Sequence, residues 1–329
     1  MVSRYSLTTR ERESFQVLVL ADDVAECEAE LVPDIGSHLI RFASRQWEMV
    51  STPPSLAAMQ QEPYAAYRYG TPLLFPPNRV RNAVFTFQER TYRLPANEPP
   101  HHLHGEISRR PWNVTDSGVD EEDGAYVTTQ FRYDHHPDLM DCFPHPLVFT
   151  CTHRLKDGRL EQTIAITNTG DDEAPFGFGV HPYFSIPFGT GERIELQVPA
   201  LAEWPVTSQA FVTGLPRETE FVRRLQTGTS LGDFPPLGVS LLSLGEGWQA
   251  CRIRLADRNV TIHYSFNGFP YLVLFRPDWS EAFSLEPYTC VTDAFNLPYD
   301  SQLTGMRGIA PGETVSLMTR LGVEWSNPS

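Results

Sequence analysis

Apolar and polar residues alternate along much of this chain, and the alternation predicts β-strands. Residues 159–168, for example, read RLEQTIAITN, with leucine and isoleucine recurring at even spacing. Side chains along a strand point alternately to the two faces of its sheet, so one face meets a core and the other meets water. No long window shows the 3.6-residue period of a helix. The pattern therefore predicts an all-β protein.

Turn signals between the apolar runs predict three hairpins. One spans Ala83–Leu94 with its turn near Gln88–Arg90, and another spans Cys251–Phe266 with its turn at Asp257–Asn259. In the third, Lys-Asp-Gly joins two long runs, and Asp-Gly is a strong turn signal. A short helix or turn is expected at Ser55–Gln61. The two strands of the third hairpin are Leu147–Leu155 and Arg159–Asn168. The other expected strands are Phe15–Leu20, Glu28–Leu31, Tyr126–Tyr133, Arg193–Val198, Tyr271–Phe275, Ala282–Leu285 and Thr314–Val323.

Prolines and glycines punctuate the whole chain. The 28 prolines and 22 glycines are spread through the 329 residues and do not gather into a linker. No repeat of about 20 to 50 residues is visible, which argues against a propeller or a solenoid. Many short strands without a break in composition predict one domain over residues 1–329, folded as a large antiparallel β-sandwich.

Composition and charge narrow the possible partners. The 41% hydrophobic and 20% charged residues are typical of a globular protein. The net charge of −15 would repel nucleic acid and anionic membranes, so neither is an expected partner. Aromatic residues make up 12% of the chain, and aromatic rings stack on the apolar faces of sugars. Lys156 is the only lysine, so Schiff-base chemistry is not expected.

The location expected from the sequence is the cytoplasm. Met1–Arg12 is polar and lacks the apolar core of a signal peptide. No run of about 18 apolar residues predicts a transmembrane helix. Five cysteines, an odd number without a Cys-x-x-Cys motif, are typical of free thiols in a reducing compartment.

Three histidines gather in the segment HHLHG, residues 101–105. The segment is either a solvated surface loop or part of a site. A metal centre of the cupin type would use His102, His104 and His181, but its glutamate would lie further along the chain than Glu106 does. We therefore expect no bound metal.

His181 is the second candidate, in the aromatic segment FGFGVHPYF of residues 176–184. Pro182 holds the residue before it in an extended conformation. Aromatic neighbours would shape a pocket of sugar size, and Tyr183 is the expected substrate contact among them. The histidine is either a hydrogen-bonded structural residue or an acid–base catalyst, since imidazole titrates near neutral pH.

Glu286 is the third candidate. It follows the apolar run Ala282–Leu285 and precedes Pro287, so we expect the strand to end just before it. Burial of a carboxylate is costly. The residue is therefore either a glutamate at a strand exit paired with an arginine, or a general base whose pKa is set by partial burial.

Four elements of the sequence resemble the aldose 1-epimerase (galactose mutarotase) family, in its bacterial mutarotase-related branch. Asn-Arg-Val, Leu-His-Gly, His-Pro-Tyr-Phe and Leu-Glu-Pro followed by Asp-Ala-Phe-Asn occur in the family's order. The resemblance implies a supersandwich fold and the interconversion of the α and β anomers of an aldose. It implies that His181 is the general acid, Glu286 the general base, His104 a second active-site histidine and Arg79 a ligand of sugar hydroxyls.

One departure from the family concerns substrate binding. The family usually carries a hydroxyl-binding aspartate before the last third of the chain, and Gly238 stands at the matching place here. Asp233 is nearby and is the candidate that takes over the contact. The difference bears on which sugar is bound more than on the proton chemistry.

The chemistry expected of such a site is acid–base ring opening. A base removes the proton of the anomeric hydroxyl, an acid protonates the ring oxygen, and reclosure on the other face gives the other anomer. No cofactor is expected, because there is no net redox change or group transfer. The expected partner is a small-molecule sugar, and the expected assembly is a monomer or a homodimer.

Two alternatives stay open on the same scaffold. The chain could be a sugar-binding or regulatory protein without turnover, because a fold does not fix a function. It could instead be a hexose-phosphate mutarotase in which arginines bind the phosphate. The arginines considered for that role are Arg79, Arg81, Arg109 and Arg110.

Overall fold

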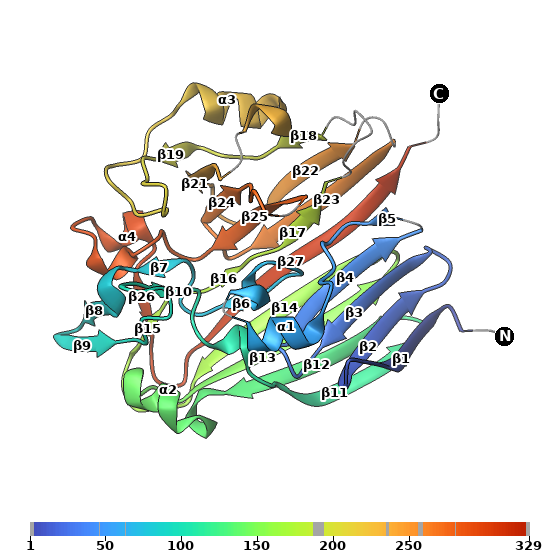
Figure 1. Ribbon diagram of the computed structural model, residues 1–329, viewed down its shortest axis with the longest axis horizontal. Coiled ribbons are helices and arrows are strands. Elements are labelled where there is room, and N and C mark those ends of the chain that lie inside the picture. The colour runs from blue at the N-terminus through green and yellow to red at the C-terminus, as the bar shows by residue number, and fades with distance from the viewer. Residues whose placement is uncertain are drawn as a thin grey trace.

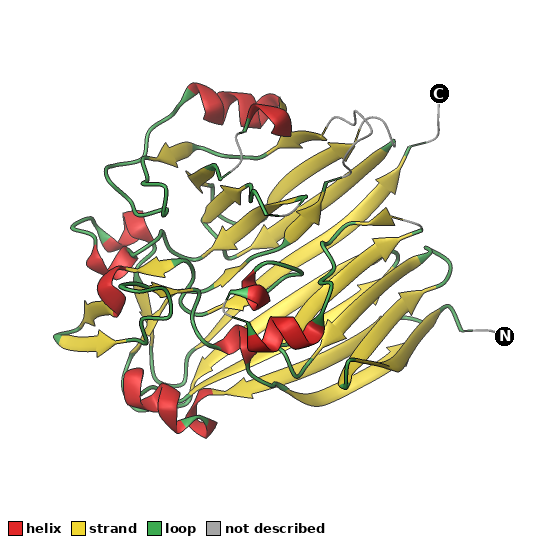
Figure 2. Cartoon of the chain, viewed as in Figure 1, coloured by secondary structure: helices red, strands yellow, loops and turns green. Residues whose placement is uncertain are grey.

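The computed structural model describes residues 3–45, 47–62, 64–186, 194–234, 237–255, 259–279 and 281–326. Most of the regular secondary structure in this part of the chain is strand in antiparallel sheets, and the helices are few and short (Figure 1, Figure 2). The all-β prediction is confirmed. The sheets stack as a large β-sandwich, and three of them determine where the candidate site lies.

The largest sheet has nine strands in the described part of the chain. Its central strands alternate buried and half-buried residues along their length, as the period of two predicts. In spatial order the strands are β11 (Asn113–Asp120), β12 (Gly124–Arg132), β13 (Leu147–Lys156), β14 (Arg159–Asn168), β27 (Thr314–Trp325), β23 (Val260–Asn267), β22 (Gln249–Leu255), β18 (Ile194–Gln197) and β20 (Thr229–Ser230).

A five-stranded sheet from the N-terminal part of the chain packs on one end of the nine-stranded sheet (Figure 1). Its β1 and β2 contact β11, β12 and β13, and the side chains between them, such as Leu20, Phe42 and Phe149, belong to one buried cluster. The five strands are β1 (Tyr5–Arg12), β2 (Phe15–Asp22), β3 (Cys27–Val32), β4 (His38–Ser44) and β5 (Trp47–Glu48).

The third sheet presents two different faces. Leu274 and Leu285 lie on the face that joins the same buried cluster as Ile253 and Tyr264 of the nine-stranded sheet. Val273 and Tyr288, which alternate with them, belong to a separate cluster on the opposite face. The strands are β19 (Ala202–Trp204), β21 (Val239–Ser243), β24 (Tyr271–Phe275), β25 (Ala282–Tyr288), β16 (Gly179–Val180) and β6 (Leu73–Leu74), with β17 (Tyr183–Ser185) also paired to β25.

Shorter elements complete the fold, and β7 to β10, α2 and α4 gather at the end opposite the two termini (Figure 1). None of the described helices is long and apolar enough to cross a membrane. The paired short strands are β7 (Arg79–Val80) with β10 (His102–Leu103), β8 (Val84–Phe87) with β9 (Arg90–Arg93), and β15 (Ala174–Phe176) with β26 (Arg307–Ile309). The α-helices are α1 (Leu56–Gln61), α2 (Pro137–Cys142), α3 (Glu220–Thr227) and α4 (Ser301–Thr304).

The predicted hairpins are present. Strand β8 pairs with β9 across Gln88–Glu89, and β13 pairs with β14 across Asp157–Gly158. All four turn residues have positive φ, as two-residue hairpin turns that match the strand twist require. The hairpin of β22 with β23 is also confirmed, although residues 257 and 258 of its expected turn lie outside the described part. Arg193, the expected start of another strand, lies outside it too, and β18 begins at Ile194.

One sequence-based prediction of local structure needs correction, and one helix was missed. Strand β25 does not end before Glu286 but continues through Pro287 to Tyr288. Helix α3 was not expected, although Thr219 caps its first turn by accepting a hydrogen bond from the Val222 amide. At eight residues, α3 is too short for its period to stand out in a sequence window.

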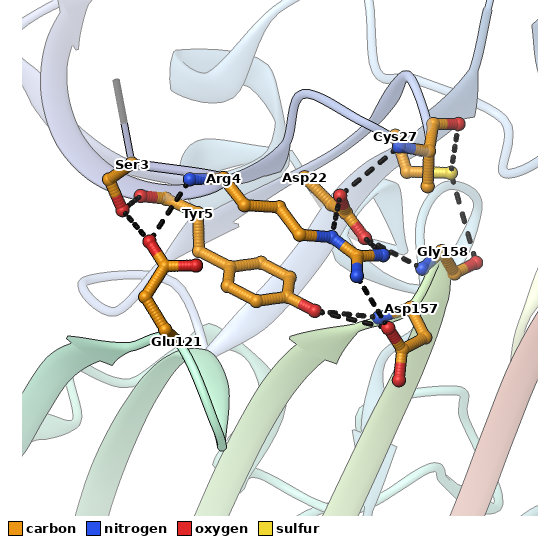
Figure 3. A network of polar contacts seen from close by, with 9 residues as sticks. Ser3, Arg4, Tyr5, Asp22, Cys27, Glu121, Asp157 and Gly158 are labelled. Atoms are coloured by element: carbon orange, nitrogen blue, oxygen red, sulfur yellow. Dashed lines mark hydrogen bonds and ion pairs between the residues drawn. The ribbon is translucent and has the colours of Figure 1, made fainter. Parts of the chain in front are cut away.

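A polar network ties the N-terminal sheet to the nine-stranded sheet (Figure 3). The carboxylate of Asp22, at the end of β2, accepts two hydrogen bonds from the Arg4 guanidinium at 2.9 and 3.0 Å. It also accepts from the backbone amides of Ala25 and Gly158, at 3.1 and 2.9 Å. Gly158 belongs to the β13–β14 turn, so one buried carboxylate joins three segments of chain.

Candidate active site

His181 and Glu286 lie opposite each other on neighbouring strands, although 105 positions separate them in the sequence. Tyr183 pairs with Ser284, and Gly179 pairs with Tyr288. Counting two residues inward from either pair brings His181 opposite Glu286, so the register is continuous across the two short strands β16 and β17. Directly opposite residues in antiparallel strands place their side chains on the same face.

Two prolines explain why no ladder hydrogen bonds are formed at this level. Pro182 follows His181, and Pro287 follows Glu286, so two amide donors are missing. The Thr289 amide donates to Phe178 at 2.9 Å, and amides two residues apart point the same way, so the Pro287 nitrogen faces the interruption between β16 and β17. A proline is tolerated inside β25 because the neighbouring strand is broken there.

Glu286 is almost completely buried, and neutral groups surround it. Its side chain is 2% exposed. Ser284 donates to Oε1 at 2.6 Å, and the Tyr288 hydroxyl donates to Oε2. Burial raises the pKa of Glu286 to about 7, although these two hydroxyls and the charge of Arg79 oppose the shift. The carboxyl group can therefore gain or lose a proton near neutral pH.

The His181 ring faces this carboxyl group. Its Nε2 lies 3.2 Å from Glu286 Oε1 and 3.4 Å from the Tyr183 hydroxyl. The ring stacks on the Tyr183 ring, with centroids 4.5 Å apart. Burial lowers the pKa of His181 to about 3, because the charged imidazolium loses its hydration. Between these two pKa values the His181–Glu286 pair therefore carries one proton, and the carboxyl group is the member with the higher pKa.

His104 is oriented by the backbone next to it. The Asn78 amide donates to His104 Nδ1 at 3.2 Å, and the His104 amide donates to the Asn78 carbonyl at 2.9 Å. Because Nδ1 accepts a hydrogen bond, the proton of the neutral ring is on Nε2. Burial, and next the neighbouring His181 ring and the charge of Arg79, lower the pKa of His104 well below its usual value. The ring is therefore a neutral donor, packed edge to face on His181 at 5.3 Å.

Two glycines allow the close packing around these histidines. A Cβ on Gly179 would lie 2.4 Å from the Tyr288 ring, which covers that position. Gly105 has a φ of 72°, and a Cβ there would lie 1.8 Å from the Phe75 carbonyl oxygen. Both glycines are in segments that carry a histidine, GVHP and LHG, and they hold those segments against the sheet.

Arg79 and Glu98 form a two-pronged ion pair beside the histidines. Arg79 Nε lies 2.5 Å from Glu98 Oε2, and Nη2 lies 2.7 Å from Oε1. The third guanidinium nitrogen donates to the Gln209 carbonyl at 3.1 Å. The two side chains are 20% and 24% exposed, so the pair is half-buried and fixed in position.

These groups line one cavity of about 450 Å³, within the usual size range of small-molecule sites. Its floor is a single face of the third sheet, because Val239, Val273, Phe275 and Glu286 are all on the same side of their strands. The described residues that line it are Tyr64, Tyr67, Arg68, Asn78, Arg79, Glu98, Leu103, His104, His181, Tyr183, Ser208, Ala210, Leu237, Val239, Val273, Phe275, Trp279 and Glu286.

The structure brings together five of the six residues that the sequence nominated. His104, His181, Glu286, Arg79 and Tyr183 all line the cavity. The sixth does not: the described wall lacks Asp233, whose half-exposed carboxylate forms an ion pair with Arg224. The expectation that Asp233 replaces the missing hydroxyl-binding acid is therefore corrected.

The structure also separates the histidines of the metal alternative. His102 Nδ1 lies 2.7 Å from the Pro95 carbonyl oxygen, and His102 is not among the described residues of the cavity wall. No group of three or more His, Cys, Asp or Glu in the described ranges is arranged to hold a metal ion. His102, His104 and His181 do not converge on one point.

Several residues of the site were not found from the sequence. Ser284 and Tyr288 bind the carboxyl group from positions two residues before and after it, which alternation along β25 would have shown if the strand had not been ended at Leu285. Asp293 accepts a hydrogen bond from the Arg81 amide at 3.0 Å, so the Asp-Ala-Phe-Asn element anchors the Asn-Arg-Val segment. Glu98 gave no local signal, because its role depends on a partner 19 positions away.

Known proteins share both the sequence pattern and the fold. A family model described as Aldose 1-epimerase matches residues 18–322. The uncharacterized protein YphB of Escherichia coli K12 is 27% identical over 260 residues, which cover 75% of this chain and 81% of that protein. A galactose mutarotase-like protein from Clostridium acetobutylicum superposes with a TM-score of 0.89 at 23% identity, covering 98% of this chain and 99% of that one. Galactose 1-epimerase from Lactobacillus acidophilus NCFM gives a TM-score of 0.77 at 17% identity, with the same coverage.

Proposed function

The chain belongs to the aldose 1-epimerase family, and we propose that it interconverts the α and β anomers of an aldose with Glu286 and His181 as its acid–base pair. One observation carries the proposal. His181 Nε2 lies 3.2 Å from Glu286 Oε1 on the wall of a cavity of sugar size. An acid and a base side by side are what the opening of a hemiacetal needs.

The proposed reaction moves two protons and no other group. Glu286 takes the proton of the O1 hydroxyl as the C1–O5 bond breaks, and His181 gives a proton to O5. The open aldehyde turns about its C1–C2 bond, and O5 then attacks the other face of C1. The two proton transfers run in reverse, so the protein ends in its starting state. No cofactor enters this sequence of steps.

His104 and Arg79 support the pair in this proposal. The proton on His104 Nε2 makes the neutral ring a hydrogen-bond donor to an oxygen of the sugar, and the ring packs on His181. The charge of Arg79 favours the ionised form of Glu286. Tyr183, Phe275 and Trp279 offer ring surface to the apolar faces of the substrate.

A sugar-binding protein without turnover is the weaker alternative. A protein that only binds a sugar can do so with groups whose protonation state does not change. Glu286 is instead buried, no cation among the described residues contacts it directly, and burial raises its pKa to about 7, which costs stability above that pH. Such a cost is typical of groups that exchange protons during a reaction.

An aldose with an anionic substituent is the second candidate. Three of the arginines first considered for a phosphate are paired with carboxylates: Arg79 with Glu98, Arg81 with Asp293 and Arg110 with Asp138. Arg109 is not among the described residues of the cavity wall. The observation that favours this candidate is Arg68, which lines the cavity over the Trp279 ring at 5.1 Å and has no carboxylate partner among the described residues.

We also propose the cytoplasm as the place of action. All five cysteines are free thiols, and Cys27, Cys151, Cys251 and Cys290 are buried. Burial raises the pKa of these thiols, which keeps them protonated and unreactive. Free cysteines are typical of proteins in reducing compartments.

Anomer exchange followed by NMR tests the proposed function. Freshly dissolved α-glucose, α-galactose and glucose 6-phosphate are followed with and without the protein, at matched pH and buffer. We expect the protein to speed the approach to anomeric equilibrium of at least one of them. Acceleration for glucose 6-phosphate alone would favour the second candidate. No acceleration of any, together with sugar binding, would favour the binding protein.

A further inference from the structure

We infer that Glu98, held by Arg79, is the residue that recognises the ring hydroxyls of the sugar and so determines specificity. The inference rests on the proposed function, because it concerns the same cavity. It extends that proposal by naming the feature of the substrate that Glu98 and Arg79 recognise, a pair of adjacent hydroxyl groups.

The cavity wall leaves few residues for this role. Asp233 is turned toward Arg224 and is not among the described residues of the cavity wall. Among the described residues that line the cavity, the carboxylates belong to Glu98 and Glu286. Glu286 already accepts from two hydroxyls and faces His181, so Glu98 is the carboxylate left to bind the rest of the sugar.

The ion pair fixes Glu98 and leaves half of its acceptor capacity free. Each carboxylate oxygen has two lone pairs, and Arg79 Nε and Nη2 occupy one lone pair on each oxygen. The other two remain for substrate hydroxyls. Arg79 also keeps N–H donors beyond those used by Glu98 and Gln209. Donors and acceptors therefore lie side by side, as two adjacent hydroxyls of a pyranose require.

The position of the pair places it next to the proposed chemistry. Arg79 is in β7, which pairs with β10, and His104 follows β10 directly. The charge of Arg79 acts on the pKa of both His104 and Glu286. A sugar with O1 and O5 at the His181–Glu286 pair would thus present its remaining hydroxyls to the wall that Glu98 occupies.

Backbone contacts hold the Glu98 segment without the carboxylate. The Glu98 amide donates to the His101 carbonyl at 3.0 Å, and the His101 amide donates back at 2.7 Å. The Asn97 side chain also bonds both backbone groups of Leu103, at 2.6 and 2.9 Å. A change of the carboxylate to an amide should therefore leave the turn in place.

The experiment compares Glu98→Gln with the wild type on an aldose and its singly deoxygenated forms. Saturation kinetics of anomer exchange should show KM raised about ten- to hundredfold and kcat changed by less than about threefold, since a hydrogen bond to a charged group is lost from ground state and transition state alike. The wild type should reject one deoxy sugar by about a hundredfold, and Glu98→Gln by less than about tenfold. Glu218→Gln, in the exposed ion pair with Arg223, is the matched control and should behave as the wild type.

The deoxy comparison separates direct contact from a purely structural role. A structural role would weaken every sugar equally and leave the ratio between parent and deoxy sugar unchanged, which would overturn the inference. Sugar binding measured by saturation-transfer NMR gives the same ratio without turnover. A wild type that binds sugar but lacks turnover would therefore overturn the proposed function, while the binding ratio would still decide the role of Glu98.

Discussion

Two buried carboxylates in this protein have opposite surroundings. The Asp22 side chain is 0% exposed and the Glu286 side chain 2% exposed, so burial alone does not distinguish them. Asp22 accepts two hydrogen bonds from Arg4 and two from backbone amides (Figure 3). Glu286 has two hydroxyls and a histidine that burial keeps neutral.

The partners decide what each carboxylate can do. Burial by itself raises the pKa of a carboxyl group. At Asp22 the Arg4 guanidinium and the amides of Ala25 and Gly158 outweigh burial, so the pKa lies below its usual value and the carboxyl group is ionised at neutral pH. At Glu286 burial prevails, and the pKa rises to about 7. The first carboxylate joins segments of the fold, and the second is able to exchange a proton with a substrate.

The largest expected effect is on turnover at the second carboxylate. Glu286→Gln keeps the shape and one acceptor but cannot take a proton, so kcat for anomer exchange should fall by about 10²- to 10⁴-fold. His181→Asn should behave alike. Sugar binding by calorimetry should change far less, because the amides still form hydrogen bonds. Wild-type turnover in Glu286→Gln would show that this carboxyl group does not take part in the reaction.

The same substitution should change how stability depends on pH. The pKa of Glu286 is about 7 in the folded protein against an ordinary value of 4.5, so the folded state holds this proton more tightly than the unfolded state. The resulting stability is complete below about pH 4 and is lost as the pH rises through 7. Relative to the wild type, Glu286→Gln should therefore gain about 3 kcal/mol between about pH 4 and pH 8.

Urea unfolding of both proteins at the two pH values measures this difference. Because each protein is compared with itself at the two pH values, any effect of the amide that does not depend on pH, on packing or on the Ser284 and Tyr288 hydrogen bonds, cancels. A difference between the two proteins that is the same at both pH values would mean that folding leaves the pKa of Glu286 at its ordinary value. The contrast with Asp22 would then disappear.

The opposite result is expected at the first carboxylate. Asp22→Asn removes the charge that Arg4 binds and leaves the amides of Ala25 and Gly158 with a weaker acceptor. The free energy of unfolding should fall by about 1 to 3 kcal/mol, the usual loss for hydrogen bonds to a buried charged group. The kcat for anomer exchange should stay at the wild-type value. A loss of turnover with unchanged stability would contradict the structural role of this network.

The two regions also differ in how much the sequence reveals. The β13–β14 hairpin could be predicted from local alternation and an Asp-Gly turn, because the residues that form it are neighbours in the chain. His181 and Glu286 could be nominated from their motifs, but their opposition depends on the register of β25 with β16 and β17. Pro287 suggested the end of a strand. The break between β16 and β17 that allows a proline inside β25 lies in another part of the sequence, so it could not be seen from the residues around Pro287.

Substrate contacts were the hardest to predict. Asp233 was chosen because it is close to Gly238 in the sequence, whereas the fold turns it toward Arg224 on α3. Glu98 was overlooked because it belongs to no motif itself, although the turn that brings it to Arg79 ends at His101, the first residue of the HHLHG segment. Distance along the chain is a poor guide to a cavity wall that loops from several sheets build together.

The pH dependence of the rate is the smallest of the expected effects. It is also the sharpest test of the contrast between Asp22 and Glu286. We expect kcat/KM for anomer exchange to stay level below neutral pH and to fall about tenfold per pH unit above about pH 7, where Glu286 loses its proton. The lower limb should lie in the acid range, because burial lowers the pKa of His181 to about 3. The spontaneous rate, measured at each pH, is subtracted.

The expected direction follows from counting protons on the pair. Ring opening in concert needs one acid and one base, so the active form of the His181–Glu286 pair carries one proton, wherever that proton resides. A neutral pair and an ion pair have the same proton count and the same pH dependence. Both are lost when the carboxyl group ionises and the imidazole stays neutral. A rate that instead rises through pH 7 would show that the ionised Glu286 works with a neutral imidazole as the proton donor, and that the pair needs no shared proton.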